Sequence, residues 1–202
     1  MVKSIVLIGG FSEIIELCKE LQYKQIFIVD KVEAGRETIY LGKDEVVQGK
    51  ILNFITCDFC ITPDLPSTRE NIFYNYNNFQ ICFPSIISKG SKISDSADIG
   101  KGSVIQYGSF ISSDVRIGKF VKLNVNSCVM HDSVIGDFST LAPSCNILGR
   151  VIIGSNCYIG TSAIIMPGVT LCNDVIVGAG AVVTKSITIP GVYVGIPAVK
   201  IK

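Results

Sequence analysis

The sequence of 202 residues is poor in charge and contains a single histidine. Charged residues make up 17% of the chain against 48% for hydrophobic residues, which excludes a disordered protein and a highly charged coiled coil. A formal net charge of +1 gives the whole chain no field that would favour nucleic acid or an anionic membrane. Mean hydropathy is high, at +0.47. Even so, no apolar run reaches the roughly 18 residues that a membrane-spanning helix needs.

The sequence also lacks the features of a secreted disulfide scaffold. Its first ten residues have one lysine, a very short apolar run and no small-residue cleavage site after them, so we expect no signal peptide and a cytoplasmic location. The eight scattered cysteines are then expected to be reduced thiols. Only Cys57 and Cys60 have metal-like spacing. With no second pair and no nearby histidine, they indicate two thiols on an apolar strand rather than a zinc site.

From residue 81 onward the sequence repeats with a period of six. Every sixth residue from Ile81 to Val183 is Ile, Leu or Val, which makes eighteen positions without a phase break. The residue four places after each of them is small, β-branched or Cys. A helix cannot keep every sixth residue on one face, and a flat strand would alternate at two without recurrent Gly, Asn and Asp. The pattern therefore predicts a solenoid.

In that solenoid each hexad forms one short strand and one corner, and three hexads make one coil of a triangular prism. The aliphatic residue is predicted to point inward, and the small residue to fit where the corners crowd. Glycines directly after the aliphatic position are expected to supply unusual backbone angles. They are Gly100, Gly118, Gly136, Gly154, Gly160 and Gly178.

The first eighty residues carry a different pattern. The stretches 4–9, 25–30 and 56–62 are predicted strands. Helices are predicted from about 12 to 21, with the first residue or its neighbour as cap, and from a capping box at 67 to about 76. Strand, helix, strand, helix favours a small parallel α/β sheet of Rossmann type.

These two patterns divide the chain into an α/β domain of residues 1–80 and a solenoid domain of residues 81–202. The first holds 8 basic and 11 acidic residues, a net charge of −3, and the second 10 basic and 6 acidic residues, a net charge of +4. A basic solenoid suits an anionic ligand. The final residues, 189–202, are expected to fold over its far end as a cap.

The turn after the first strand is a candidate phosphate site. Gly9 and Gly10 open it, and the helix that starts near Ser12 offers backbone N–H groups to an anion. Asp30 ends the second strand and precedes Lys31, and a carboxylate there can bind a ribose hydroxyl or a base edge. The GxGxxG fingerprint is absent, which disfavours NAD. A tight turn that only packs a helix on a sheet is the alternative interpretation.

The only histidine, His131, lies two residues after the inward Val129 and is followed by Asp132. We expect it at an exposed corner or face of the prism. A neutral imidazole can take a proton from an incoming amine or hydroxyl, and a nearby carboxylate can fix its tautomer. A histidine with no function on the surface is the alternative when this residue is considered alone.

The hexad region resembles the left-handed β-helix of hexapeptide-repeat acyltransferases. The whole chain resembles the branch of nucleotide-sugar acetyltransferases that includes bacillosamine-pathway and perosamine N-acetyltransferases and sialic acid O-acetyltransferases. The resemblance rests on the Gly-Gly start with Asp30, on residues 124–139 and on the ending 191–198. It implies a Rossmann-like sheet followed by a left-handed parallel β-helix, and a homotrimer with clefts between its subunits.

The resemblance also implies roles for residues. His131 would be the general base and Asp132 its orienting carboxylate, while the backbone N–H of Gly149 would polarise the thioester carbonyl. Asn124 would line the same cleft. Acetyl-CoA would lie along the outer groove between two prisms, with a lysine near its phosphates. The residues expected along that groove are Gly149, Gly160, Ala163, Gly178 and Ala181, and the candidate lysines are Lys185, Lys200 and Lys202.

The implied activity is transfer of an acetyl group from acetyl-CoA to the amino group of a nucleotide-linked amino sugar, such as a 4-amino-4,6-dideoxy sugar, in glycan biosynthesis. It would need no metal and no covalent enzyme intermediate. Thr140 stands where some relatives carry a second histidine, and the start at Gly9 lacks the histidine of many, so the substrate stays open. The alternatives are a sugar O-acetyltransferase of the sialic acid type and a non-enzymatic solenoid scaffold.

Overall fold

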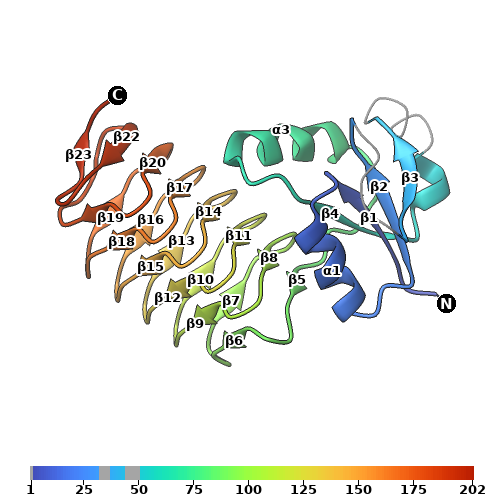
Figure 1. The fold of residues 1–202 in the computed structure, drawn as a ribbon, viewed down its shortest axis with the longest axis horizontal. Helices are drawn as coiled ribbons and strands as arrows, with labels where there is room; N and C mark the ends of the chain where they lie inside the picture. Colours follow the sequence, from blue (N-terminus) through green and yellow to red (C-terminus); the bar gives the residue numbers. More distant parts are fainter. Residues whose placement is uncertain (1, 32–36, 44–50) are drawn as a thin grey trace.

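The computed structural model describes residues 2–31, 37–43 and 51–202. Its N-terminal part is a parallel four-stranded sheet in the order β3-β2-β1-β4, followed along the chain by a long prism (Figure 1). The elements of the N-terminal part are β1 (Ser4–Ile8), α1 (Ser12–Glu20), β2 (Gln25–Val29), β3 (Ile39–Gly42), the 3-10 helix η1 (Ile51–Phe54), β4 (Asp58–Ile61) and α3 (Pro66–Tyr76). The predicted strands and helices of a small parallel α/β sheet are confirmed, with bounds shifted by one or two residues.

The starts of the two helices differ from the prediction. The N-cap of α1 is Phe11 and that of α3 is Leu65, and neither cap makes a side-chain hydrogen bond. The predicted capping box at 67–70 is therefore wrong. Pro66 occupies the first turn of α3. An N–H at this position would have no acceptor within the helix, so the lack of an N–H in proline costs no hydrogen bond. Arg69 then faces inward and is fully buried, instead of lying on a solvated first turn.

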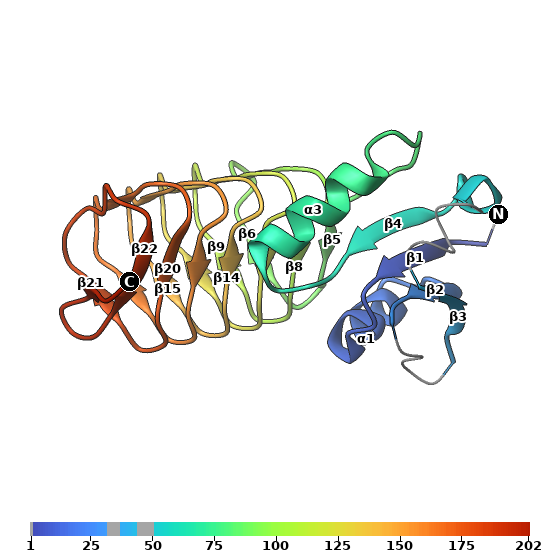
Figure 2. The same cartoon turned by 90° about the horizontal axis from the view of Figure 1, so that it is seen from above.

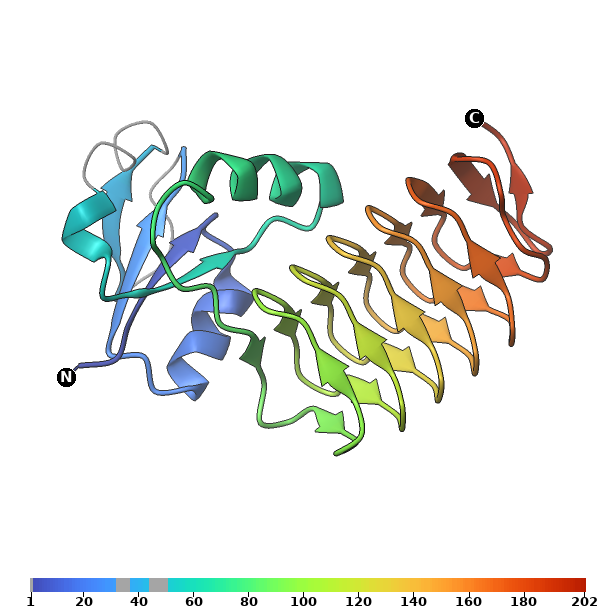
Figure 3. The same cartoon turned by 180° about the vertical axis from the view of Figure 1, so that it is seen from behind.

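Seventeen short strands, β5 to β21, form the three faces of the prism (Figures 1 and 3). They are β5 (Ile86–Ile87), β6 (Lys92–Ile93), β7 (Asp98–Ile99), β8 (Val104–Ile105), β9 (Phe110–Ile111), β10 (Arg116–Ile117), β11 (Lys122–Leu123), β12 (Cys128–Val129), β13 (Val134–Ile135), β14 (Thr140–Leu141), β15 (Asn146–Ile147), β16 (Ile152–Ile153), β17 (Tyr158–Ile159), β18 (Ile164–Ile165), β19 (Thr170–Leu171), β20 (Val175–Val177) and β21 (Val182–Val183). Every third strand belongs to the same sheet.

The register of the sheets confirms three hexads per coil. Ile105 pairs with Leu123, and Leu123 with Leu141, so each strand lies beside the strand that starts eighteen residues later. The aliphatic residues point inward, and from Ile105 onward they form one continuous buried core. The small residue four places later is buried as well. Ser133 shows why a hydroxyl suits this place, because its Oγ donates to Leu148 O at 2.9 Å and accepts from Val151 N at 3.2 Å, and so links two coils.

The hexad that starts at Ile81 departs from the pattern. It forms no strand of the prism, because Cys82 pairs instead with Asp58 at the edge of the N-terminal sheet. Phe59 N donates to Cys82 O at 2.8 Å. The edge strand β4 thus takes its outer partner from the segment that leads into the prism.

The prediction that glycines after the aliphatic residues supply unusual backbone angles is wrong. Positive φ occurs two places further on, where residues as large as Phe120 and Arg150 adopt it at each corner. The predicted glycines allow close approach of coils instead. A Cβ on Gly136 would lie 2.5 Å from the carbonyl carbon of Gly154, so only hydrogen fits between the two coils there.

The helix α3 lies along the prism next to the sheet that contains β5, β8 and β11 (Figure 2). Its Phe73 ring packs 4.6 Å from the ring of Phe120, which in turn stacks on Phe138 of the next coil at 5.3 Å. On the other side, α1 and the N-terminal sheet share a core with Ile86 and Val104 of the first coils. The two parts of the chain are therefore joined by continuous apolar packing.

The C-terminal residues extend one face of the prism. β22 (Gly191–Val194) pairs in parallel with β20, and β23 (Val199–Lys200) then pairs antiparallel with β22. The C-terminus thus lies at the end of the prism opposite the N-terminal sheet (Figure 1). No helix in the described ranges is long and apolar enough to cross a bilayer.

We expect Gly136→Ala to destabilise the protein by about 2–3 kcal/mol, because the new methyl group meets rigid backbone of the next coil. Urea unfolding followed by circular dichroism measures the change. Gly168→Ala is the matched control. Gly168 has φ +72° with nothing within 4 Å of a Cβ, so its replacement costs about 1 kcal/mol from the backbone alone. An equal loss in both variants would contradict the close-approach explanation.

Candidate functional site

His131 lies just past β12, at the corner between two faces of the prism. Its side chain is 45% exposed, as expected for a residue outside the inward set. The Nδ1 atom of His131 lies 2.8 Å from Oδ2 of Asp132. Asp132 occupies the left-handed corner position, with φ +59°, which turns its carboxylate back toward the ring. The pair therefore leaves Nε2 as the ring nitrogen available to a ligand.

Gly149 lies eighteen residues after His131 and directly above it in the next coil. Arg150 N donates to His131 O at 2.9 Å, which fixes the two coils together at this point. A Cβ on Gly149 would lie 2.7 Å from Nε2 of His131, so the imidazole fills the space of the missing side chain. Gly149 is buried, and its N–H has no hydrogen-bond acceptor within the part of the chain that the structure describes.

Asn124 does not belong to this corner within one chain. It follows β11 on the face that packs against the N-terminal sheet, whereas His131 follows β12 on the next face. Its Nδ2 donates to Oδ1 of Asp64 at 3.3 Å. Thr140, on the same face as Asn124, is fully buried and donates its hydroxyl to Asp64 O at 2.5 Å. The position of a second histidine in some relatives is thus part of the domain junction here.

The predicted phosphate turn borders a cavity of about 380 Å³. Gly9, Asp30 and Lys31 line it, together with the ring of Phe11. The carboxylate of Asp30 accepts from Gly10 N at 2.7 Å and from Lys31 N at 2.5 Å. It therefore connects the turn after β1 with the turn after β2, and both turns border the cavity. The full lining is Ile8, Gly9, Phe11, Val29, Asp30, Lys31, Pro63, Thr68 and Ile72.

Two of the predicted residues play other parts at this edge. Gly10 contributes its N–H to Asp30 and does not itself line the cavity. Ser12 is exposed in the first turn of α1 and lies outside the lining. Gly9 has φ +107°, and a Cβ there would lie 2.3 Å from Thr62 Oγ1. Glycine is required at this turn because β1 and β4 approach each other closely at its position.

Four of the six residues expected at acetyl-CoA make packing contacts between coils within one chain. Ala163 and Ala181 are fully buried in the prism core, so neither faces an outer groove. The space beside Gly160 is filled by Ala179 N, 2.6 Å from a built Cβ, and that beside Gly178 by Val194 Cγ1 at 2.8 Å. These four positions serve coil packing. Gly149 stays a candidate through its N–H.

The candidate lysines lie near the far end of the prism. Lys185 is exposed in the segment after β21, and Lys202 is exposed at the C-terminus. Lys200 lies in β23, and its side chain passes 2.6 Å from the Cβ position of Gly191. Lys185 and Lys202 are therefore free to meet an anion from solvent.

The junction between the two domains holds charged residues that the sequence pattern did not single out. Lys122 is fully buried, with Nζ 2.8 Å from Oδ1 of Asp64 and 2.9 Å from Thr62 O. Its Nζ also lies 5.0 Å from the centre of the Phe11 ring, which borders the cavity at the phosphate turn. A lysine at the outward position of a strand is ordinarily solvated. The sequence therefore contains no sign that Lys122 is covered by the N-terminal domain and paired with Asp64.

None of the thiols is activated at this site. Burial raises the pKa of Cys145 to about 12 and that of Cys157 to about 11, and it also raises the pKa of Cys128. Cys57 and Cys60 are buried, and burial raises the pKa of Cys60 to about 12. A thiol must be deprotonated to attack or to bind zinc. Across the described residues, no three His, Cys, Asp or Glu side chains are grouped to hold a metal.

Comparison with known proteins places these features in context. Residues 150–185 match the model of the hexapeptide repeat of succinyl-transferase. The hexapeptide-repeat resemblance is confirmed. Comparison with curated proteins by sequence gives no match.

Three solved structures cover nearly the whole chain. PerB from Caulobacter crescentus, in complex with CoA and GDP-perosamine, is 25% identical with a TM-score of 0.92 over 100% of this chain and 99% of that chain. The acetyltransferase domain of PglB from Neisseria gonorrhoeae is 24% identical with a TM-score of 0.93, over 98% and 100%. A histidine-to-alanine variant of GDP-perosamine N-acetyl transferase from Caulobacter crescentus is 23% identical with a TM-score of 0.92, over 100% and 98%. The predicted Rossmann-like sheet followed by a left-handed β-helix is confirmed.

We expect Asp64→Ala to lower the free energy of unfolding by about 2–3 kcal/mol, because Lys122 would keep a buried charge without its carboxylate. The loss is smaller than for a fully buried pair because Asp64 is 41% exposed. The double variant Asp64→Ala/Lys122→Met removes both charges and should recover most of the loss. Urea unfolding of the two variants and the wild type measures this. A double variant as unstable as the single one would contradict the ion-pair explanation.

Proposed function

We propose that the chain is an acetyl-CoA-dependent N-acetyltransferase that acts on the amino group of a nucleotide-linked amino sugar. The observation that carries the proposal is the His131 corner, where the ring is oriented by Asp132 at 2.8 Å and lies beside the backbone of Gly149. The likeness to PerB, which was solved with CoA and GDP-perosamine, supports the choice of both substrates.

The proposed chemistry uses His131 as a general base. The amino group of the sugar, once it has lost its first proton to solvent, attacks the thioester carbonyl carbon and forms a C–N bond. Nε2 of His131 takes the second proton, and the carboxylate of Asp132 stabilises the imidazolium through Nδ1–H. The tetrahedral intermediate then breaks its C–S bond, and CoA leaves with the proton that His131 returns.

Gly149 is proposed to stabilise the oxyanion. The N–H of Gly149 has no acceptor among the described residues, so an oxygen that develops negative charge beside it could accept from this donor. The absent side chain leaves room for the imidazole of His131 directly beside this backbone. Lys185 and Lys202 are proposed to meet the phosphates of CoA, because both are exposed on the basic domain.

The nucleotide is proposed to occupy the cavity bordered by Gly9, Asp30 and Lys31. The diphosphate would lie at the N-terminus of α1, next to Gly10 and Ser12, where the helix dipole favours an anion. His131 and Asn124 lie on different faces of one chain, so a cleft that contains both needs a second prism. We therefore propose a homotrimer with its active sites between subunits, in the cytoplasm, where the eight free thiols stay reduced.

We expect His131→Ala to lower kcat for acetyl transfer by about 10²–10⁴-fold, the usual contribution of a general base. Acetyl-CoA consumption is measured against a panel of UDP-, dTDP- and GDP-linked amino sugars and free sialic acid. Cys128→Ser is the control, because this thiol lies on β12, the strand that directly precedes His131, and has a pKa raised by burial. It should retain wild-type activity.

Each other outcome of that assay selects an alternative. Turnover only on a hydroxyl group would establish the sugar O-acetyltransferase instead. Turnover that is indifferent to the loss of His131 would overturn the base mechanism. No turnover on any sugar, together with no binding of acetyl-CoA by calorimetry, would favour the non-enzymatic scaffold.

We expect Gly149→Ala to abolish most activity without unfolding the prism. The added methyl group would lie 2.7 Å from Nε2 of His131 and would push the imidazole out of place. Because this imidazole is half exposed and can rotate into solvent, the melting temperature should change little. Parallel measurement of kcat and thermal unfolding separates the two effects, and full activity in the variant would exclude Gly149 from the site.

A further inference from the structure

The far end of the prism carries a group of exposed aliphatic side chains. Ile189, Ile196, Val199 and Ile201 are between 59% and 76% exposed, and all four lie in or next to the hairpin of β22 and β23. Among the other large aliphatic residues that the structure describes, only Val2 at the opposite end of the chain is as exposed. Single exposed aliphatic residues are ordinary, but a group of them at one end of a molecule indicates a surface that something apolar covers.

The register of the last strands joins several of these residues into one apolar face. Ile176 is the outward residue of β20, since its two neighbours in the strand are buried. It pairs with Val192 of β22, and Val194 pairs with Val199 of β23. Residues that pair across strands, and alternate residues within a strand, lie on the same face of a sheet. The last three rows of the prism therefore share one outward face, formed by Ile176, Val192, Val194, Val199 and Ile201.

The lysine of the last strand lies on the opposite side from this face. Lys200 stands between Val199 and Ile201, so the alternation of a strand turns it the other way. β23 is also the outermost strand of its sheet, which places both of its sides at the end of the prism. A lysine at this place can extend its ammonium group to a phosphate while the aliphatic residues enter a less polar layer.

The charged side chains of this end are all positive. Residues 175–202 contain three lysines, Lys185, Lys200 and Lys202, and no Arg, Asp or Glu, which gives a net charge of +3. The nearest carboxylate earlier in the chain is that of Asp174, in the corner before β20. The net charge of +1 of the whole chain hides this end, because residues 1–80 contribute −3. An apolar face accompanied by lysines and by no carboxylate suits an anionic surface.

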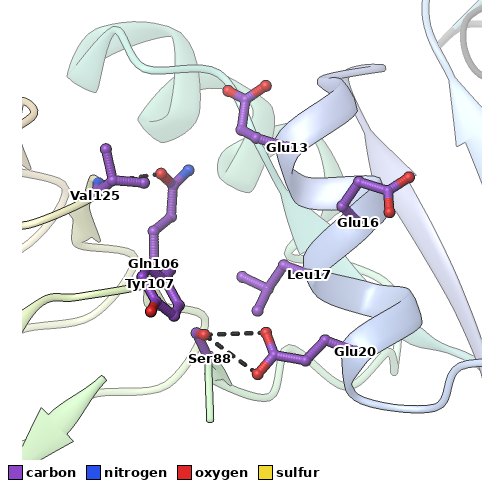
Figure 4. A pocket seen from close by; sticks show the side chains of 8 residues that line it. All are labelled: Glu13, Glu16, Leu17, Glu20, Ser88, Gln106, Tyr107 and Val125. Atoms are coloured by element: carbon purple, nitrogen blue, oxygen red, sulfur yellow. Dashed lines mark hydrogen bonds between the residues drawn. The ribbon is translucent and has the colours of Figure 1, made fainter. Parts of the chain in front are cut away.

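The opposite end of the molecule has the reverse charge. Glu13, Glu16 and Glu20 lie along one side of α1, where they border a cavity of about 360 Å³ against the first coils of the prism (Figure 4). β22 and β23 lie at the other end of the prism from α1 (Figure 1). An anionic surface therefore repels the N-terminal end and attracts the C-terminal end, so that the molecule approaches it with β23 first.

We propose that the C-terminal end of the prism, residues 175–202, docks on the surface of an anionic lipid bilayer. The aliphatic face of β22 and β23 enters the headgroup region, and Lys200 meets the lipid phosphates. The contact is peripheral, since it uses a short hairpin at the depth of the headgroups. The N-terminal sheet and the cavity at Gly9 then lie at the end that points away from the bilayer (Figure 1). This contact does not depend on the proposed acetyl transfer.

Flotation of the full chain with lipid vesicles tests this contact. The probes are vesicles with about one third phosphatidylglycerol and vesicles of phosphatidylcholine alone, each at about 0.1 M NaCl, where the Debye length is about 10 Å. We expect the chain to bind the anionic vesicles about a hundredfold more tightly, because each of the three lysines contributes about fivefold near an anionic surface. Raising the salt to about 1 M NaCl should remove most of this difference.

The variant Ile196→Ser/Ile201→Ser should bind the anionic vesicles about tenfold more weakly, because less apolar area leaves water. Lys200→Gln should weaken binding about fivefold. Lys200 is the one lysine of this end with no proposed part in CoA binding. The matched controls are Val2→Ser and Lys101→Gln, which change an exposed aliphatic residue and an exposed lysine far from β23. They should bind as the wild type does, and circular dichroism checks that every variant is folded.

Failure of the wild type to bind the anionic vesicles would overturn the proposed contact. Equal binding to both kinds of vesicle, or unchanged binding of Ile196→Ser/Ile201→Ser, would do so as well. Sedimentation equilibrium tests another occupant, since a smaller assembly in this variant than in the wild type would assign the end to a second copy of the chain and overturn the bilayer contact. None of these measurements uses acetyl-CoA or a sugar. A chain that binds the vesicles but transfers no acetyl group would overturn the proposed function alone.

Discussion

The arrangement of the molecule depends on one buried guanidinium. Arg69 is 1% exposed and donates to the carbonyl oxygens of Phe120 and Phe138, which occupy left-handed corners of two successive coils. It also donates to Ser139 O at 3.0 Å, and to Pro63 O and Asp64 O at 2.8 Å each. Burial lowers its pKa to about 10, which still leaves it charged at neutral pH. Five backbone oxygens therefore replace water around this cation, and they belong to both domains.

This contact explains why the segment after β4 is placed where ligands would meet. With Arg69 fixed, Asp64 stands between the cavity at Gly9 and the prism, where it accepts from Lys122 and Asn124. Lys122 in turn lies beside Phe11, at the N-terminus of α1. The cavity that Phe11 borders is therefore linked, through Lys122 and Asp64, to the packing of α3 on the prism.

Much of the prism could be predicted from the sequence, because each short segment of a solenoid shows by itself which residue enters the core. Each strand of the prism needs an aliphatic residue at the inward position, so an aliphatic residue at every sixth place reveals the register. The register alone places Gly149 above His131. Arg69 and Lys122 could not be recognised in this way. Their partners in the other domain are 51 to 70 residues away in sequence, and the fixed period carries no information on which outward residues a second domain will cover. The glycines after the aliphatic residues are wrongly predicted to adopt positive φ. A missing side chain also allows two coils to approach each other closely, and this is the role that these glycines have.

The same repeat determines how little the site itself requires. Parallel strands hold successive coils at a spacing of roughly 4.8 Å. A side chain on one corner therefore has the backbone of the next coil within reach, and this backbone offers an N–H wherever the residue is not proline. Any side chain at 149 would occupy the space of the imidazole, since a Cβ already lies 2.7 Å from Nε2. One histidine, one carboxylate at the left-handed position and one glycine thus supply the proposed base and oxyanion donor. Selection of the nucleotide is then proposed to depend on residues outside the hexad repeat, such as Gly9 and Asp30 at the edge of the N-terminal sheet.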